Sequence, residues 1–93
     1  MEQATQAGSL TSQWRELFSN WPEQRPRRGL IISSWQEFLS FDDFLISDEA
    51  LFLNRPQPDS VGARKIMIPF SQILAVKFTE VFEFDEFSSM GFR

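Results

Sequence analysis

A chain of 93 residues has the length of one small domain, and its 11 Phe and 3 Trp supply enough apolar side chain to fill a compact core. The absence of Cys and His excludes disulfides and thiolate chemistry, and it removes both the commonest transition-metal ligand and the side chain most used as a general base near neutral pH. We therefore expect a protein that is not an enzyme and has no cofactor and no metal, and whose net charge of −4 opposes binding to nucleic acid.

Residues 1–10 are mostly small and polar, which predicts a disordered tail, and residues 11–93 then form a single small domain. The first ten residues have neither the basic nor the apolar segment of a secretory signal. No apolar run approaches the roughly 18 residues of a membrane span. We expect a cytoplasmic protein.

A short helix is predicted from Ser12, a good N-cap residue, to the residue before Pro22, where the helix must end. Four apolar residues fall at i, i+3, i+4 and i+7 and predict one buried face: Trp14, Leu17, Phe18 and Trp21. This face is expected to cover a β core. A helix that binds a partner is the alternative.

Residues 22–28 combine two prolines with three arginines and predict an extended connector. Arg25, Arg27 and Arg28 could bind phosphate or carboxylate in a bidentate manner, which makes them a candidate anion-binding site. They are also the only support for contact with an anionic membrane. The alternative is that they pair with acidic residues of the chain or lie in a solvated loop.

Apolar and β-branched runs predict the first strands. Gly29 opens one at residues 29–35, Gln36 and Glu37 mark a turn or bulge, and apolar character resumes at residues 38–41. Residues 44–47 and 50–55, separated by Asp48 and Glu49, predict a hairpin. Both runs of this hairpin are apolar on both faces, so we expect both faces to be covered.

Residues 55–63 predict the longest loop, and residues 65–68 a strand that Pro69 ends. A one-turn link at residues 70–72 leads to an alternating strand at residues 73–79, with a short helix over residues 71–78 as the alternative. In the tail, Phe82 and Phe84 alternate with acidic residues and predict a sixth strand at the edge of the sheet. We expect Phe82, Phe84 and Phe87 to bind a protein partner or a second copy there.

The stretch FLISDEALFL, a charged loop and RKIMIPFSQILAVKF, residues 44–78, is similar to the core of GRAM domains and of bacterial domains with a pleckstrin-homology-like fold. The matching positions are residues 46–49, 51–53, 68–69 and 73–76. The resemblance implies a mainly β (α+β) fold, a small and strongly bent antiparallel sheet or barrel of five to six strands with one N-terminal helix. It also implies a binding module, and phosphoinositide or anionic lipid as a possible ligand. The chain departs from this pattern because no C-terminal helix is predicted.

The same order of elements is also similar to Sm-like proteins, and residues 40–44, SFDDF, resemble their second strand. This resemblance implies a ring-forming RNA-binding protein. We treat it as the alternative to a binding module that engages protein.

The acidic groups carry no metal-binding spacing, and the single glycine of the loop at residues 58–65 does not make a phosphate-binding loop. Residues 22–28 sum to +2 from three Arg and one Glu, and residues 80–93 sum to −3 from four acids and one Arg. Head-to-tail contact between copies is one hypothesis that follows from these opposite charges.

Overall fold

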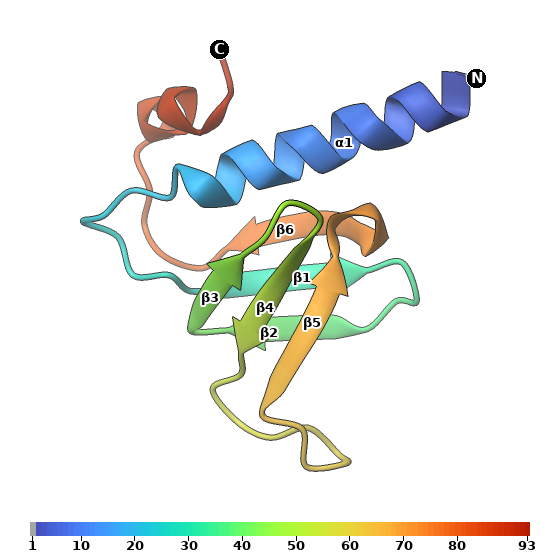
Figure 1. Cartoon of the computed structure of the whole chain (residues 1–93). Helices are drawn as coiled ribbons and strands as arrows, with labels where there is room; N and C mark the ends of the chain where they lie inside the picture. The colour runs from blue at the N-terminus through green and yellow to red at the C-terminus, as the bar shows by residue number, and fades with distance from the viewer. Residues whose placement is uncertain (1) are drawn as a thin grey trace.

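The computed structural model describes residues 2–93, with the side chains of residues 10–93. One α-helix, α1 (Glu2–Ser19), precedes six strands and two short 3₁₀ helices (Figure 1). The strands are β1 (Gly29–Ser33), β2 (Phe38–Phe41), β3 (Asp43–Ile46), β4 (Ala50–Asn54), β5 (Lys65–Pro69) and β6 (Ile73–Phe78). The 3₁₀ helices are η1 (Phe70–Gln72), between β5 and β6, and η2 (Phe84–Met90), near the C-terminus.

The strands form two antiparallel three-stranded sheets, with orders β2-β1-β6 and β3-β4-β5. Asp42 alone separates β2 from β3, so the chain passes directly from one sheet to the other, and the strands of the two sheets cross in Figure 1. The expected N-terminal helix and five to six antiparallel strands are confirmed. The expectation of a barrel is wrong, because the two sheets do not close on each other.

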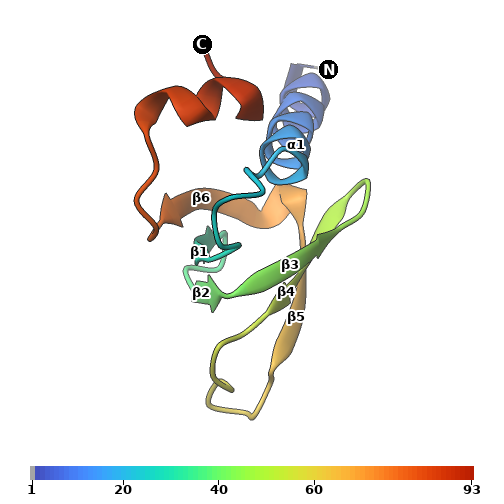
Figure 2. The same cartoon turned by 90° about the vertical axis from the view of Figure 1, so that its left-hand side faces the viewer.

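The helix α1 lies over the sheets, as Figures 1 and 2 show. Its predicted apolar face is confirmed, since Leu17, Phe18 and the following Trp21 are buried and Trp14 is partly buried. Apolar burial of this kind supplies most of the stability of a helix in a folded protein.

The start of the helix differs from the prediction. The helix begins at Glu2 and not at Ser12, so residues 2–10 continue it where we expected a disordered tail; Met1 lies outside the described residues. The physical reason is composition, because Glu, Gln and Ala in this segment are good helix formers and Gly8 is its only strong helix breaker. Polar composition alone did not distinguish a helix from a disordered tail.

Burial along the hairpin β3–β4 alternates. Phe44, Leu51 and Leu53 are buried, whereas Leu45 is 67% exposed and Phe52 is 44% exposed. The expectation that both faces of this hairpin are covered is therefore wrong. One face packs against the core, and the other carries apolar side chains that no described element covers.

The C-terminal tail forms η2 and not the predicted sixth strand. Glu83 and Glu86 make a capping box at its start, and Gly91 ends it with a φ of 105°, a left-handed conformation that favours glycine. Phe87 and Met90, three residues apart, pack against the core from one side of the helix. In the sequence, the alternation of Phe and acidic residues just before Phe87 predicted a strand. The three-residue spacing of Phe87 and Met90 was therefore not recognised as helical.

The last strand and its link agree with the prediction. Residues 70–72 form the one-turn helix η1, and residues 73–78 form a strand rather than the alternative helix.

The loop before β5 is held by Asp59, whose Oδ1 accepts hydrogen bonds from Val61 N at 3.0 Å and Ala63 N at 2.8 Å. These backbone bonds, with that of Ala63 foremost, hold the pKa of Asp59 below its usual range. None of the helices in the described part of the chain is long and apolar enough to cross a membrane.

Trp21 is the ring around which the elements gather. It lies 5.4 to 6.1 Å from the ring centroids of five phenylalanines that come from α1, β2, β3, β6 and the segment after β6. They are Phe18, Phe41, Phe44, Phe78 and Phe82. Trp21 Nε1 also donates a hydrogen bond to Pro26 O at 3.1 Å, which satisfies the one polar atom of this buried ring.

We predict that Trp21→Ala lowers the free energy of unfolding by about 3 to 5 kcal/mol, because it leaves a cavity among the five rings. Trp21→Phe should lower the free energy of unfolding by less than Trp21→Ala does. It loses the hydrogen bond to Pro26 but keeps an aromatic ring in the cluster. Trp35→Ala is the matched control, because Trp35 is half exposed and should cost under about 1 kcal/mol. Urea unfolding followed by circular dichroism measures all three, and equal losses at Trp21 and Trp35 would contradict this account.

Candidate protein-interaction groove

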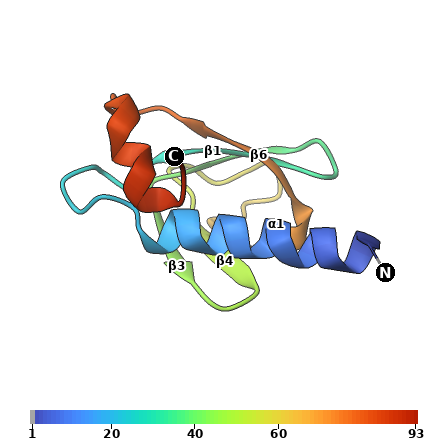
Figure 3. The ribbon, with the colours of Figure 1, turned by 90° about the horizontal axis from the view of Figure 1, so that it is seen from above.

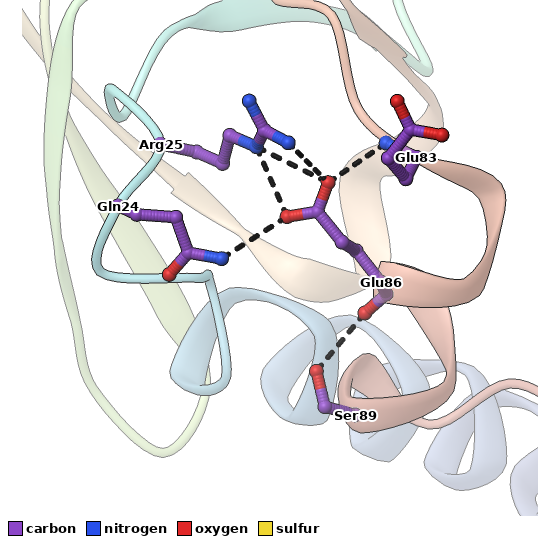
Figure 4. A network of polar contacts seen from close by, with 5 residues as sticks. All are labelled: Gln24, Arg25, Glu83, Glu86 and Ser89. Carbon is purple, nitrogen blue, oxygen red and sulfur yellow. Dashed lines mark hydrogen bonds and ion pairs between the residues drawn. The ribbon is translucent and has the colours of Figure 1, made fainter.

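The structure does not bring the three arginines of the candidate anion-binding site together around one point. Arg25 forms a bidentate pair with Glu86 of η2, with Nη2 at 2.7 Å from Oε1 and Nε at 3.0 Å from Oε2 (Figure 4). Gln24 donates to the same carboxylate at 3.2 Å, and the backbone N–H of Glu83 donates to it at 2.7 Å. Arg25 therefore ties the connector to the C-terminal helix.

Arg27 and Arg28 lie elsewhere. Arg27 donates to Phe44 O at 2.9 Å, stacks over the Phe44 ring at 4.5 Å, and lies 3.6 Å from Asp43 Oδ1. Arg28 lies 3.8 Å from Glu80 and lines a separate hollow of about 520 Å³. Each of the three guanidinium groups thus faces a carboxylate of its own chain, and the opposite charges of residues 22–28 and 80–93 meet within one molecule.

The pair between Arg25 and Glu86 shifts both groups toward their charged forms. The hydrogen bond from Arg25 holds the pKa of Glu86 below its ordinary value of 4.5, and the same bond raises the pKa of Arg25. The Glu86 carboxylate accepts hydrogen bonds from Arg25, Gln24 and Glu83. An external anion would therefore not readily displace it from Arg25.

The predicted partner-binding residues Phe82, Phe84 and Phe87 divide into two groups. Phe82 and Phe87 stack on each other at 5.3 Å, are partly buried, and both lie close to Phe78 of β6. Phe84 is 93% exposed. The segment is therefore not an edge strand, but Phe84 and Phe87 line a hollow in the described part of the molecule.

This hollow is an apolar groove of about 770 Å³ between α1, β6 and η2, which we call the β6 groove. In Figures 2 and 3 the last strand runs below and beside the two helices that border it. Its apolar lining comes from three parts of the chain: Trp14 and Leu17 of α1, Leu74, Ala75, Val76 and Phe78 of β6, and Phe84, Phe87 and Phe92 of the C-terminal segment.

One side of the β6 groove is a strand edge. Among the strands of residues 2–93, β6 pairs only with β1, which leaves the backbone N–H and C=O groups along its other edge without a strand partner. An edge of this kind is a template on which another extended chain can pair. Leu74 is 61% exposed beside this edge, so the groove offers both backbone hydrogen bonds and apolar contact.

The open strand edge lies on a different segment from the one that the sequence predicted. The alternation in residues 80–86 predicted the exposed edge there, whereas the edge belongs to β6. Leu74 gave no signal of its exposure, because it shares the apolar face of the predicted strand 73–79 with Val76 and Phe78. The role of α1 as one wall of the groove had no signal, because it depends on how the helix packs.

Other polar chemistry in the described residues is sparse. No group of three or more acidic residues among residues 10–93 is arranged to hold a metal ion. Trp14 Nε1, in the wall of the β6 groove, is buried and has no hydrogen-bond partner among the described residues. A buried N–H donor without an acceptor lowers the stability of the fold, unless a group other than the described residues accepts its hydrogen bond.

We predict that the contact of η2 with the connector weakens at acidic pH. The contribution of Glu86 is fully present above pH 4.5 and is lost as the pH falls through its lower folded-state pKa, because protonation removes the charge that Arg25 binds. Backbone chemical shifts of residues 84–91 should therefore titrate with a midpoint below 4.5. Glu86→Gln should abolish this transition and Asp85→Asn, an exposed neighbour, should not; a midpoint above 4.5 would contradict the account.

Comparisons of the chain with protein-family models, with curated proteins and with solved structures each found no match. The similarity of residues 44–78 to GRAM and pleckstrin-homology-like domains therefore stays a prediction, as does the similarity to Sm-like proteins. The candidate site rests on the contacts and exposures described above.

Proposed function

We propose that this protein is a non-enzymatic protein-interaction module that takes up an extended segment of a partner protein along the open edge of β6. The observation that supports this is the β6 groove, an apolar channel of about 770 Å³ that has an unpaired strand edge as one side. Backbone pairing gives affinity in this mode of recognition, and side-chain pockets beside the strand give specificity.

Apolar burial favours occupation of the groove. Leu74 and Phe84 are large apolar side chains that lie mostly in solvent, and covering each would contribute about 1.5 to 3 kcal/mol. Phe92, which is 43% exposed, is a third apolar side chain in the same lining. Exposed apolar side chains gathered along one channel, rather than scattered singly, are typical of an interaction site.

The geometry also suggests what kind of segment would fit. Side chains of an extended chain alternate between two faces, so a ligand strand paired with β6 would direct every second residue toward Trp14 and Leu17 or toward Phe84. We expect apolar residues at those alternate positions. The only charged residues in the lining of the groove are Asp85 and Arg93. We therefore expect few charges in the partner segment that binds there.

We also propose that the chain is related to GRAM and pleckstrin-homology-like domains. Residues 43–78 follow the order strand, turn, strand, loop, strand, one-turn link, strand on which the similarity to GRAM and pleckstrin-homology-like domains is based. We include in this proposal a cytoplasmic location. Contact with anionic lipid has less support, because Glu86 holds Arg25 and the three arginines do not gather around one point.

A library of random peptides of about 12 residues, displayed on phage and selected against the full chain, tests the proposal. We predict that the selected peptides share apolar residues at alternate positions. Phe84→Ser and Leu74→Ser should each weaken their binding about tenfold or more, because each removes apolar contact but leaves the fold intact. Val61→Ser and Val81→Ser are matched controls, since both residues are exposed and neither lines the groove.

Two results would contradict the proposal. One is a selection that yields no peptide with measurable affinity for the full chain. The other is a set of peptides whose binding is unaffected by Phe84→Ser and Leu74→Ser. Circular dichroism of every variant confirms that it is folded.

An Sm-like, ring-forming RNA-binding protein is the second candidate. It is supported by the pairing of the last strand with the first, β6 with β1, and by the outer positions of β5 and β6, which leave an edge on each for a neighbouring copy. Light scattering would then give six or seven copies, and RNA binding would weaken steeply with salt. A monomer or dimer that does not bind RNA contradicts this candidate and is compatible with the interaction module.

A further inference from the structure

The outer face of the sheet β3-β4-β5 carries an uncovered apolar row. Leu45 pairs with Phe52, and Phe52 pairs with Met67, so the three side chains lie side by side across the three strands. They are 67%, 44% and 62% exposed. In Figure 2 no other element lies against the outer side of these strands, which is the side away from β1, β2 and β6.

A polar row runs beside the apolar one on the same face. Asp43 pairs with Asn54, and Asn54 pairs with Lys65, two residues along each strand from the apolar row. Asp43 lies on β3 at one side of the sheet, and Lys65 lies on β5 at the other side. The row therefore has a negative end, a neutral centre and a positive end.

We propose that this face is a self-association surface, and that its occupant is the same face of a second copy of the chain, related by a two-fold axis parallel to the strands. Such an axis places β3 of one copy over β5 of the other and β4 over β4. The negative end of each polar row then faces the positive end of the other. Leu45 faces Met67, and Phe52 faces Phe52 of the second copy.

Charge favours this arrangement over the other possible two-fold packing. An axis perpendicular to the strands would place β3 over β3 and β5 over β5, with the polar rows at opposite ends of the interface. Asp43 and Lys65 would then have no opposite charge across the interface. Only the parallel axis makes the face complementary to itself in both charge and apolar contact.

The charged groups are available to a second copy. Asp43 is 64% exposed at its side chain, and its nearest cation, Arg27, is 3.6 Å away, a long exposed pair that contributes little. Lys65 is exposed and donates to Asn54 Oδ1 at 3.0 Å, which holds the ammonium group over the sheet. Ala50, which pairs with Pro69 on the next row, presents small side-chain bulk and allows close approach.

The size of the face sets the expected strength. One strand of four residues and two of five cover roughly 14 Å by 17 Å of sheet. A standard stable interface buries about 800 Å² on each partner, which is more than this face alone supplies. We therefore expect a weak dimer that forms at high concentration rather than an obligate one.

Sedimentation equilibrium of the full chain from about 10 µM to about 1 mM tests the proposal. We expect a reversible monomer–dimer equilibrium. Asp43→Lys alone and Lys65→Asp alone should each raise the dissociation constant about tenfold, because each places like charges opposite each other twice in the dimer. An equimolar mixture of these two variants should recover the wild-type constant, because every facing pair is again of opposite sign.

Phe52→Ser should also raise the dissociation constant about tenfold, since it removes the centre of the apolar row. Asp48→Lys and Arg64→Asp are matched charge controls at exposed positions outside the two rows, and they should leave the constant unchanged. A chain that stays monomeric to about 1 mM, a mixture of the two charge variants that associates no better than either alone, or an assembly larger than a dimer would each overturn the proposal.

Discussion

The packing of Trp21 holds this fold together. Its ring contacts aromatic side chains from the helix, from both sheets and from the segment that leads into η2. In a chain of 93 residues with no disulfide, few other contacts link so many elements. Because the connector after Trp21 also carries Arg25, the same turn of chain positions the ion pair with Glu86 and hence η2.

This arrangement explains why the molecule has exposed apolar surface. The aromatic cluster fills the space where α1, the two sheets and the tail meet, but it does not extend along the whole length of β6 or over the outer face of β3-β4-β5. Leu74 and Phe84 remain uncovered in the first region, and Leu45 and Met67 in the second. Two separate surfaces follow, one with an open strand edge and one with a complete strand row, so they favour different kinds of partner.

Much of the fold was predictable because local patterns were strong. The apolar spacing from Trp14 to Trp21, the hairpin around Asp48 and the link at residues 70–72 each depend on neighbours close in sequence. The features that were missed depend on tertiary packing. Whether Leu45 and Phe52 are covered depends on which elements lie against them, and the helical tail depends on Glu86 meeting Arg25, 61 residues earlier. The groove was not predicted, although Phe84 and Phe87 in its lining were named as partner-binding residues, because its other walls come from distant segments.

The most direct test of the central claim is an NMR measurement on the full chain bound to a peptide selected for its affinity. The account predicts cross-strand nuclear Overhauser effects between the backbone of the peptide and residues 74–78, with shift changes at Trp14 and Phe84. A complex in which residues 74–78 are unperturbed, and the changes lie instead on the outer face of β3-β4-β5, would contradict it.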